Sequence, residues 1–442
     1  MSAPAPASSP LRDRYDVVVV GGGPAGTTFA NYLARGGADV LVVEKSRHPR
    51  FSVGESLLPK TMAIWEELGL LERLDATFVR KYGAYFDFAA CADPEYYHFP
   101  EAARRRHDHA YEVERSEFDR ILWEAAGEQG AHCVAHLEVV AWHRDGDAVH
   151  GVRLRGEDGT ETDVRARLVA DCAGRRALLG TELGLRVPDR FLNKVGLVGH
   201  WDGAIRSTGD DEGTLCILAT DWGWVWLIPF RGDRVSVGAV VDNAVFARRI
   251  KGSDPTALLE ALIEETPGLR SRLAAATRVG DVESLANFSF QCRRYAGDGW
   301  VMVGDAAAFL DPVFSSGVHL AMSSARAAAM DALAALARPD RPRRRDFRGY
   351  ERSARTALKV FRTFIYAWYR PEFRTVFMRV PRGRPGVEWL YAEILAVLAG
   401  DVFNPWRAYP PIYMLLAISK AQALADRLGR PGPARPSLPA PS

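Results

Sequence analysis

The stretch Tyr15-Asp-Val-Val-Val-Val20-Gly21-Gly-Gly23-Pro-Ala-Gly26 decides the fold of this chain. Its first half is a short run of β-branched residues, which is typical of a parallel strand buried on both faces. The glycines follow at once in the spacing G-x-G-x-x-G, and residues 27–36 then have the composition of a helix that ends in glycines. This strand, turn and helix predict the first unit of an α/β fold that binds a dinucleotide.

The glycines and a later acidic residue predict how the dinucleotide is held. Gly21 permits the tight turn, Gly23 lets the backbone approach a pyrophosphate, and Gly26 allows the helix to pack closely on the strand. A second strand is predicted over residues 39–44. It ends at Glu44, where an acid meets a ribose hydroxyl in such folds.

Length and composition describe an ordinary globular protein. The chain has 442 residues, of which 48% are hydrophobic and 25% are charged, and its formal net charge is +2. That length accommodates a large two-part enzyme, and the near-neutral charge argues against a dedicated nucleic-acid-binding protein. No run of 18 or more uninterrupted apolar residues occurs, so we expect no membrane-spanning helix.

The cysteines indicate a reducing compartment. Their number is odd, their spacing is wide and no C-x-x-C pair occurs, so the sequence supports neither a zinc site nor a disulfide framework; they are Cys91, Cys133, Cys172, Cys216 and Cys292. We therefore expect reduced thiols in a cytoplasmic protein, with no bound metal. Residues 1–13 and the proline-rich residues 430–442 are expected to be disordered.

Three later motifs resemble the fingerprints of p-hydroxybenzoate-hydroxylase-like flavoproteins. They are Arg115-Ser-Glu-Phe118-Asp119-Arg-Ile-Leu122, Val169-Ala-Asp171-Cys-Ala-Gly174 and Val301-Met-Val-Gly304-Asp305-Ala-Ala307. The resemblance implies that FAD is the dinucleotide, that Arg115 contacts it and that Asp305 meets its ribityl chain. No second G-x-G-x-x-G is present for a nicotinamide cofactor.

Two further motifs indicate which reaction the flavin carries out. Trp224-Val-Trp226-Leu-Ile228-Pro229 matches W-x-W-x-I-P, and Phe309-Leu-Asp-Pro312-Val-Phe-Ser315-Ser-Gly317 matches F-x-x-P-x-x-S-x-G. With these motifs the chain is similar to the flavin-dependent halogenases over about residues 14–405. It is closest to those that act on pyrrole or phenol rings tethered to carrier proteins, which residues 54–59, 78–84 and 400–403 also resemble.

The resemblance implies halogenation of an electron-rich aromatic ring in secondary-metabolite (antibiotic) biosynthesis. A separate flavin reductase supplies FADH2, which forms a C4a-hydroperoxide with O2, and chloride or bromide converts this into a hypochlorous-acid equivalent. An amine at a dry tunnel end must route that oxidant to the ring, because desolvation lowers the pKa of a lysine and exposes its lone pair. Lys81 is the candidate, and Lys60 is a weaker rival.

Other site residues follow from the same resemblance. Trp224 and Trp226 alternate, so they share one face of a strand and are expected to separate the substrate from the flavin. Backbone amides of Ser315, Ser316 and Gly317 are expected to form the halide site over the flavin, since successive amides make an anion nest. The residues expected to contact FAD are Gly21, Gly23, Ala25, Gly26, Glu44, Lys45, Glu55, Ser56, Arg115, Asp305, Pro312, Gly317 and Val318.

One difference from the tryptophan halogenases bears on which substrate this chain uses. Tryptophan halogenases carry a glutamate just before the serine of the flavin-facing loop, whereas this chain carries Phe314. The resemblance therefore favours a phenolic or pyrrolic ring over free tryptophan. An acyl or peptidyl carrier protein is the expected bearer of that ring, and the basic strip Arg343–Arg345 is a candidate surface for docking it, although a solvated linker explains the strip equally well.

The predicted architecture is an α/β, GR2-type Rossmann-like FAD module with an inserted antiparallel substrate sheet. The module covers residues 14–337, and the insertion covers about 82–111 and 188–280, with strands at 195–201, 214–220, 224–230 and 235–241. Helices are predicted at 256–275, 315–337, 347–369 and 410–428. Residues 338–429 are expected to form a C-terminal helical region.

Two alternatives remain open from the sequence. An FAD-dependent hydroxylase or reductase of the same fold shares the flavin fingerprints, and incorporation of oxygen without halogen would identify it. A non-catalytic flavoprotein that scaffolds a biosynthetic complex would bind FAD but yield no hypochlorous acid from FADH2.

Overall fold

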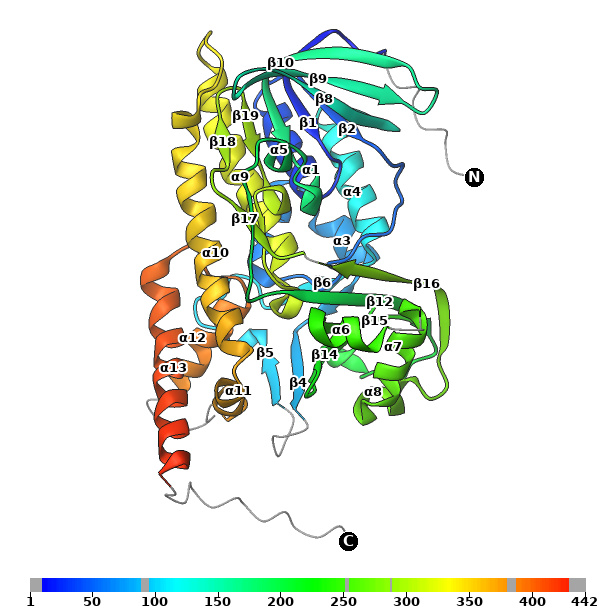
Figure 1. The fold of residues 1–442 in the computed structure, drawn as a ribbon, viewed down its shortest axis with the longest axis vertical. Coiled ribbons are helices and arrows are strands. Elements are labelled where there is room, and N and C mark those ends of the chain that lie inside the picture. The colour runs from blue at the N-terminus through cyan, green and yellow to red at the C-terminus, as the bar shows by residue number, and fades with distance from the viewer. Residues whose placement is uncertain (1–9, 89–94, 251–253, 287, 380–386, 429–442) are drawn as a thin grey trace.

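The computed structural model describes residues 10–88, 95–250, 254–286, 288–379 and 387–428. It confirms the predicted first unit, in which β1 (Arg14–Val20) leads through the glycine turn into α1 (Pro24–Arg35) and β2 (Val40–Glu44). This unit lies at one end of the molecule, at the top of Figure 1.

The first sheet has the strand order β18-β19-β10-β1-β2-β7. Its central strands β19 (Trp300–Met302), β10 (Glu161–Asp171), β1, β2 and β7 (His132–Ala135) are parallel, while β18 (Ala296–Gly297) is antiparallel. The hairpin β8 (Leu137–Asp145) and β9 (Ala148–Gly156) extends from β10. Because β1, β2 and β10 are covered on both faces, their valines are almost fully buried.

The second sheet confirms the predicted insertion. Its order is β16-β12-β15-β14-β13-β4-β5, and all pairs are antiparallel except β13 with β4. The predicted strands correspond to β12 (Lys194–Asp202), β13 (Leu215–Ala219), β14 (Gly223–Pro229) and β15 (Arg234–Asp242). The sheet also takes in β4 (Gly83–Phe88), β5 (Glu95–His98) and β16 (Thr277–Ala286). The division into domains remains a proposal.

Alternation along β14 gives this sheet two different faces. Trp224, Trp226 and Ile228 point to one side, and Val225 and Leu227 point to the other. The second side packs under α7 (Pro255–Glu264) and α8 (Pro267–Leu273). The tryptophan side therefore faces the interior, toward the C-terminal helices.

The prediction of one helix over residues 256–275 is wrong. Glu265 and Thr266 separate α7 from α8, and Pro267 begins α8, because proline has no N–H for a continuing helix and sets the start of a new one. The predicted last helix begins earlier, since α13 spans Pro405–Arg427 and carries Pro410 and Pro411 inside it. In the C-terminal region two helices were not predicted, α11 (Pro371–Phe377) and α12 (Glu388–Leu398).

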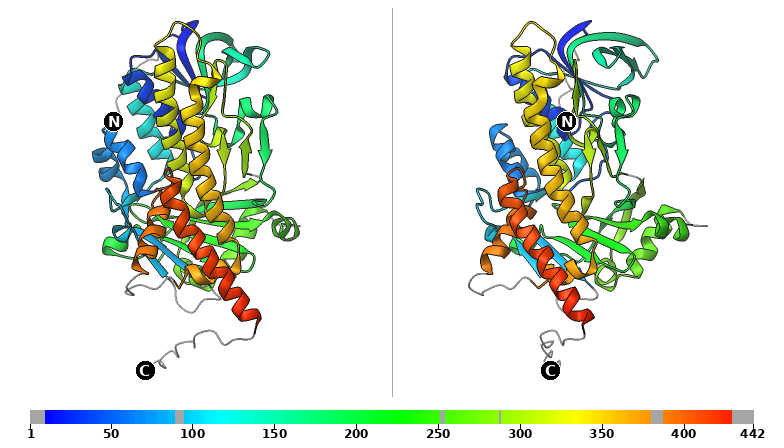
Figure 2. Two further views of the ribbon diagram at one scale, coloured as in Figure 1. Left: turned by 90° about the vertical axis from the view of Figure 1, so that its left-hand side faces the viewer. Right: turned by 60° about the vertical axis from the view of Figure 1, so that its left-hand side comes forward.

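The C-terminal helices join the two sheets. The predicted helices are confirmed as α9 (Ser316–Leu336) and α10 (Arg348–Trp368). Phe347 and Tyr350 pack with the parallel sheet, while Phe364 and Trp368 pack with the tryptophan face of the second sheet. Figure 2 shows α10 running along the molecule beside α9, with α13 continuing at the other end.

The remaining elements are short. They are α2 (Met62–Glu67), α3 (Leu71–Thr77), β3 (Val79–Lys81), β6 (Ala110–Glu112), α4 (Arg115–Glu128), α5 (Leu178–Glu182), β11 (Arg186–Pro188), α6 (Asn243–Arg249), β17 (Phe290–Cys292) and β20 (Ala308–Phe309). The pair β3–β6 forms a two-stranded sheet of its own.

The prediction that residues 1–13 are disordered is wrong for the residues just before β1. Arg12 pairs with Asp39 at 2.5 Å and lies over the ring of Tyr15. Residues 1–9 and the predicted disordered tail 430–442 lie outside the described residues. None of the helices in the described part of the chain is long and apolar enough to cross a bilayer.

Candidate functional site

Two adjoining cavities occupy the space between the sheets. A polar cavity lies at the carboxyl ends of β1 and β2, and an apolar cavity lies under the tryptophan face of the second sheet. They share lining residues from both halves of the chain, which are Pro24, Val53, Arg115, Arg175, Asp305 and Ala321. A long ligand can therefore extend from one cavity to the other.

The glycine turn is shaped for a phosphate group in the polar cavity. A Cβ on Gly23 would meet only the Arg50 guanidinium, at 3.5 Å, so this side of the turn is open to a ligand. A Cβ on Gly26 would lie 1.9 Å from the carbonyl oxygen of Gly21, which makes Gly26 a packing requirement. Gly21, Gly23, Ala25 and the exposed Lys45 line this cavity, and Gly26 does not.

Glu44 is held at the floor of the polar cavity. Its Oε2 accepts a hydrogen bond from the backbone N–H of Gly22 at 2.9 Å, and its Oε1 accepts from that of Ser46 at 3.1 Å. Arg50 contacts the same carboxylate at 3.4 Å. The acid and the turn are therefore fixed as a unit, which fits the ribose and pyrophosphate of a dinucleotide.

Charged groups gather where the two cavities meet. Arg115 pairs through two hydrogen bonds with Asp119, at 2.8 and 3.0 Å, and also donates to the carbonyl of Val53. Burial raises the pKa of Asp305 to about 6, against the opposing effect of Arg175 and Arg115. Burial also lowers the pKa of the Arg175 guanidinium. These groups need a polar partner, and the ribityl chain and ring edge of FAD would supply one.

The loop before α9 has a strained turn at the serine of the motif. Ser315 adopts a left-handed conformation, with φ of 55°, that is uncommon for a residue other than glycine. Asp311 holds the loop by accepting from the N–H of Val313 at 3.0 Å. Pro312, Ser315, Gly317 and Val318 line the apolar cavity, whereas the buried Ser316 lines neither cavity.

The side chain of Phe314 lies away from both cavities. Its ring stacks on Phe364 at 4.6 Å between centroids and meets Trp368 edge to face. Phe314 therefore packs the loop against α10 in this chain.

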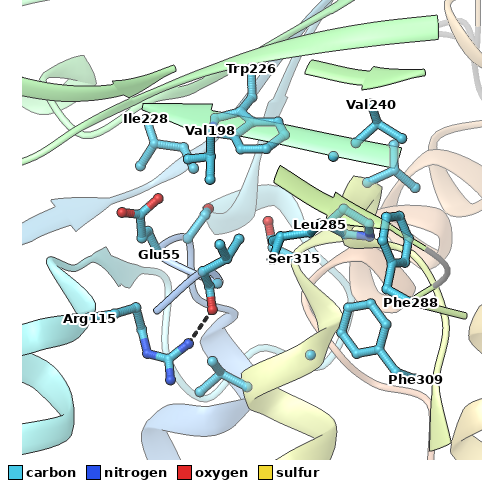
Figure 3. A pocket seen from close by; sticks show the side chains of 18 of the residues that line it. Glu55, Arg115, Val198, Trp226, Ile228, Val240, Leu285, Phe288, Phe309 and Ser315 are labelled. Carbon is cyan, nitrogen blue, oxygen red and sulfur yellow. Dashed lines mark hydrogen bonds between the residues drawn. The ribbon is translucent and has the colours of Figure 1, made fainter. Parts of the chain in front are cut away.

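The wall of the apolar cavity comes from the second sheet (Figure 3). Trp224 and Trp226 both line it, with ring centroids 5.6 Å apart, and their indoles are almost fully buried. Gly238, opposite Trp226 on β15, leaves room for that indole, because a Cβ there would lie 2.1 Å from it. In Figure 3, Trp226 and Val240 lie on the sheet side, and Arg115 lies on the opposite side.

A hydrogen-bond chain joins this wall to the loop. The indole N–H of Trp224 donates to the Tyr369 hydroxyl at 3.1 Å, and that hydroxyl donates to Asp311 at 2.8 Å. Trp226 donates instead to Ser236 at 3.2 Å. Tyr369, at the end of α10, thus ties both motifs together.

Lys81 is buried immediately behind the cavity wall. Its Nζ donates to the Ser56 hydroxyl at 2.7 Å and to the carbonyl of Leu57 at 3.2 Å. Burial lowers the pKa of Lys81, and Glu112, whose Oε1 is 3.9 Å from Nζ, opposes this effect. Lys81 itself does not line the apolar cavity, but Ser56 does. Glu55 also lines this cavity and contacts His200 at 2.7 Å.

The rival lysine and the basic strip lie elsewhere. Lys60 donates to the carbonyl of Arg104 at 3.3 Å and lies 3.6 Å from Asp401, and it lines neither cavity. Arg343–Arg345 are exposed and lie between α9 and α10, at the top of Figure 1. This strip is at the opposite end of the molecule from the tryptophan sheet, so the docking of a carrier is not assigned to it.

Sequence reasoning missed four residues of the site. Arg50 and Arg175 line the cofactor cavity, Tyr369 links the motifs, and Glu112 pairs with Lys81. None of them belongs to a motif with a fixed spacing. A signal was present for Glu112 alone, since it lies just before the Arg115 motif in a short strand. In the described residues no group of three or more His, Cys, Asp or Glu side chains is placed to hold a metal ion.

Comparison with known proteins agrees with this geometry. A family profile described as FAD binding domain matches residues 14–358, so the chain belongs to that family of flavoproteins. The 1H-pyrrole-2-carbonyl peptidyl-carrier-protein chlorinase of Pseudomonas fluorescens is 33% identical over 420 residues, which are 88% of this chain and 90% of the relative. The corresponding brominase of Pseudoalteromonas luteoviolacea is 30% identical over 406 residues, covering 90% and 95%.

Solved structures give the same result. The flavin-dependent brominase Bmp2 matches with a TM-score of 0.81 and 28% identity, covering 93% of this chain and all of that one. The myxobacterial chondrochloren halogenase CndH matches with a TM-score of 0.76 and 30% identity, covering 92% and 97%. The chain is a flavin-dependent halogenase that uses FAD and a halide to halogenate an aromatic ring. The hydroxylase and scaffold alternatives are therefore set aside.

Proposed function

We propose that this halogenase acts on an uncharged, electron-rich phenol or pyrrole that is presented as a thioester on a carrier protein. One observation carries the proposal. Among the described residues that line the apolar cavity, all those from the second sheet are uncharged and lack polar side chains apart from the indole N–H groups; they are Gly196, Val198, Leu215, Ile217, Trp224, Trp226, Ile228, Val240 and Leu285.

This wall disfavours a charged substrate. A carboxylate or ammonium group buried against it would have no partner, and an unpaired buried charge costs several kcal/mol. Of the four described acidic or basic side chains that line this cavity, Arg115, Arg175 and Asp305 face the junction with the cofactor cavity, and Glu55 already contacts His200. A free amino acid is therefore a poor fit, whereas a thioester has lost the charge of its carboxylate. The names of the pyrrolyl-carrier chlorinase and brominase relatives support the same choice.

Lys81 is proposed to carry the halogen to the ring. When bound in its reduced form, FAD supplies, with O2 and chloride or bromide, the oxidised halogen as hypohalous acid. The lone pair of the Lys81 amine attacks the halogen, the oxygen–halogen bond breaks, and the hydroxide leaves as water with a proton from the nitrogen. The oxidant is expected to reach the amine beside Ser56, which lines the cavity.

The other site residues are proposed to bind FAD and the halide and to keep the ring away from the flavin. We propose that Trp224 and Trp226 keep the ring apart from the flavin, and that the backbone amides of Ser315, Ser316 and Gly317 hold the halide. The residues proposed to contact FAD are Gly21, Gly23, Ala25, Glu44, Lys45, Glu55, Ser56, Arg115, Asp305, Pro312, Gly317 and Val318, whereas Gly26 is proposed to serve the packing of the turn. A flavin reductase is the proposed source of FADH2. The four cysteines in the described residues are free thiols, which supports a cytoplasmic location.

The test compares three forms of the same ring under one supply of FADH2: the free acid, a small neutral thioester and the carrier-bound thioester. We expect the carrier-bound form to react fastest and the free acid slowest. The small thioester separates the two causes, because it removes the charge without providing a carrier. Equal rates for the free acid and both thioesters would contradict the proposal.

The role of Lys81 is tested separately with Lys81→Met, which keeps the apolar stem and removes the amine. Halogenation is expected to fall at least a hundredfold, while bound flavin and its reoxidation are retained. Lys60→Met is the matched control and is expected to keep full activity. A Lys81→Met protein that retains most of its activity would remove Lys81 from the mechanism.

A further inference from the structure

Glu112 is a buried acid beside Lys81 that the proposed mechanism has not used. The register of β3 with β6 pairs Val79 with Glu112 and Lys81 with Ala110, so the Lys81 and Glu112 side chains lie diagonally on one face. The carboxyl group of Glu112 is fully buried. Its Oε1 accepts a hydrogen bond from the Ser56 hydroxyl at 3.0 Å, and its Oε2 has no hydrogen-bond partner within the described chain.

The hydrogen bonds of Lys81 fit a neutral amine. A neutral amine has two N–H groups and a lone pair, and Nζ has two polar partners within hydrogen-bond distance, the Ser56 hydroxyl and the Leu57 carbonyl. An ammonium would have a third N–H, for which the structure offers only Glu112 at 3.9 Å and the Phe99 ring at 5.4 Å. The orphaned Oε2 likewise fits a neutral carboxylic acid better than a carboxylate, because an ionised oxygen needs partners when it is buried.

We propose that Glu112 is the proton partner of Lys81 and exchanges a proton with its amine through the hydroxyl of Ser56. This inference rests on the halogen-carrying role proposed for Lys81 and deepens it. The path is continuous, since Nζ to Oγ is 2.7 Å and Oγ to Oε1 is 3.0 Å. Movement of a proton from ammonium to carboxylate along this path leaves neither group charged, and burial favours the neutral form of both groups.

The exchange serves both halves of halogen transfer. In the first half the ammonium gives its proton to Ser56 while Ser56 gives its own to Glu112, which frees the nitrogen lone pair for the halogen. In the second half the nitrogen–halogen bond breaks as the halogen bonds to the ring. The nitrogen must gain a proton at that point, and Glu112 supplies it through Ser56. The proton that the ring then loses returns to Glu112, so atoms and charge balance.

The surroundings set the pH range of this exchange. Burial raises the pKa of Glu112 to about 8, which Lys81 and the Ser56 hydrogen bond oppose and Glu55 reinforces. From the neighbouring elements, Glu55 contacts His200, and the Cys216 thiol of β13 has its pKa raised to about 11 by burial. No cation other than Lys81 contributes to the pKa of Glu112 among the described residues. Glu112 is therefore a proton donor below about pH 8 and ceases to be one above it.

The experiment separates loading of the lysine from transfer to the ring. The holoenzyme is given FADH2, O2 and chloride with no ring, and the peptide that carries Lys81 is examined by mass spectrometry for one chlorine in place of one hydrogen. The ring substrate is then added to the flavin-depleted, chlorinated protein, and loss of the adduct is followed between pH 6 and pH 9. Glu112→Gln and Ser56→Ala are compared with the unaltered protein and with the control Glu117→Gln, a partly exposed acid on α4.

In the unaltered protein and the control, the adduct is expected to form and to pass to the ring more slowly above pH 8. In Glu112→Gln the adduct is expected to form more slowly, to persist about a hundredfold longer and to show no break near pH 8. Ser56→Ala should behave in the same way. Transfer from Glu112→Gln at the rate of the control would overturn the inference. Absence of the adduct in the unaltered protein would overturn both this inference and the proposed role of Lys81, whereas an adduct with normal transfer in Glu112→Gln leaves that role intact.

Folding of the variants is checked by bound flavin and by their unfolding curves. Glu112→Gln keeps the size of the side chain and can accept the hydrogen bond from Ser56. If this variant fails to fold, Ser56→Ala carries the same decision, since it interrupts the same path without altering either charged group.

Discussion

The buried Lys81–Glu112 pair leads to a prediction about stability that needs no cofactor. Lys81→Met leaves Glu112 buried without a cation, and Glu112→Gln leaves Lys81 buried without an acid. Each single variant should therefore acquire a pH dependence of its unfolding free energy that the unaltered pair does not have. The two dependences should have opposite signs.

The signs follow from the pKa shifts. The pKa of Glu112 is raised to about 8 in the folded state from an ordinary value of 4.5, so between those limits the folded protein holds a proton that the unfolded chain does not. Its contribution to stability is complete below the lower limit and is lost as the pH rises. The pKa of Lys81 is lowered, so the unfolded chain holds the extra proton and stability rises with pH up to the ordinary value of 10.5. In the unaltered pair the two effects cancel at pH values between the folded pKa of Lys81 and that of Glu112.

The magnitude is about 1.4 kcal/mol for each pH unit over which one group differs by a full proton. Between pH 5 and pH 8, Lys81→Met should lose roughly 4 kcal/mol relative to the unaltered protein. Glu112→Gln should change in the opposite direction over the part of this range that lies above the folded pKa of Lys81. Urea unfolding of the cofactor-free proteins at four pH values measures the change in unfolding free energy of each variant. The double variant should follow the unaltered protein, and parallel curves for all four proteins would refute the burial of this pair as the structure has it.

Two further predictions concern the cofactor turn and the loop. Gly23→Val should lose bound flavin while its cofactor-free form unfolds at the same temperature as the unaltered protein, whereas Gly26→Ala should lower the unfolding temperature, because only Gly26 has protein backbone where its Cβ would go. Flavin absorbance per protein measures the loss of cofactor, and thermal melting measures the unfolding temperature. Full retention of flavin by Gly23→Val would contradict the prediction for the cofactor turn. Tyr369→Phe should lower the free energy of unfolding by about 1–3 kcal/mol, because it leaves Trp224 without its acceptor and the Oδ2 of buried Asp311 without its donor; unchanged urea unfolding would show that the hydrogen-bond chain contributes nothing.

Local sequence patterns predicted the parts of the fold that depend on local rules. The strand, glycine turn and helix at residues 14–35 have a periodicity and spacing that admit few alternatives, and the alternation in β14 placed both tryptophans on one face. The break at Pro267 carried a usable signal, since proline favours the first turn of a helix, yet the apolar periodicity on both sides concealed it.

The missed site residues depend on contacts between distant segments. Glu112 meets Lys81 only because β3 pairs with β6, and Tyr369 meets Trp224 only because α10 crosses the second sheet. Neither contact leaves a spacing in the sequence. Phe314 shows the converse, because its place in a motif favoured a phenolic or pyrrolic substrate, whereas its ring packs against Phe364.

The arrangement explains how one chain can make an indiscriminate oxidant and still use it selectively. The charged groups that suit a cofactor stop at the junction formed by Arg115, Arg175 and Asp305, and beyond it the cavity wall is apolar. In that part the described titratable groups within reach are Glu55, which contacts His200, and the Lys81–Glu112 pair behind Ser56. Burial lowers the pKa of an amine in such a place and shields it from water, which is the condition that the proposed halogen-carrying role of Lys81 requires. If that proposal and the proposed uncharged substrate are both right, the same apolar wall protects the amine and selects the ring, so the choice of ring and the control of the oxidant have one structural cause.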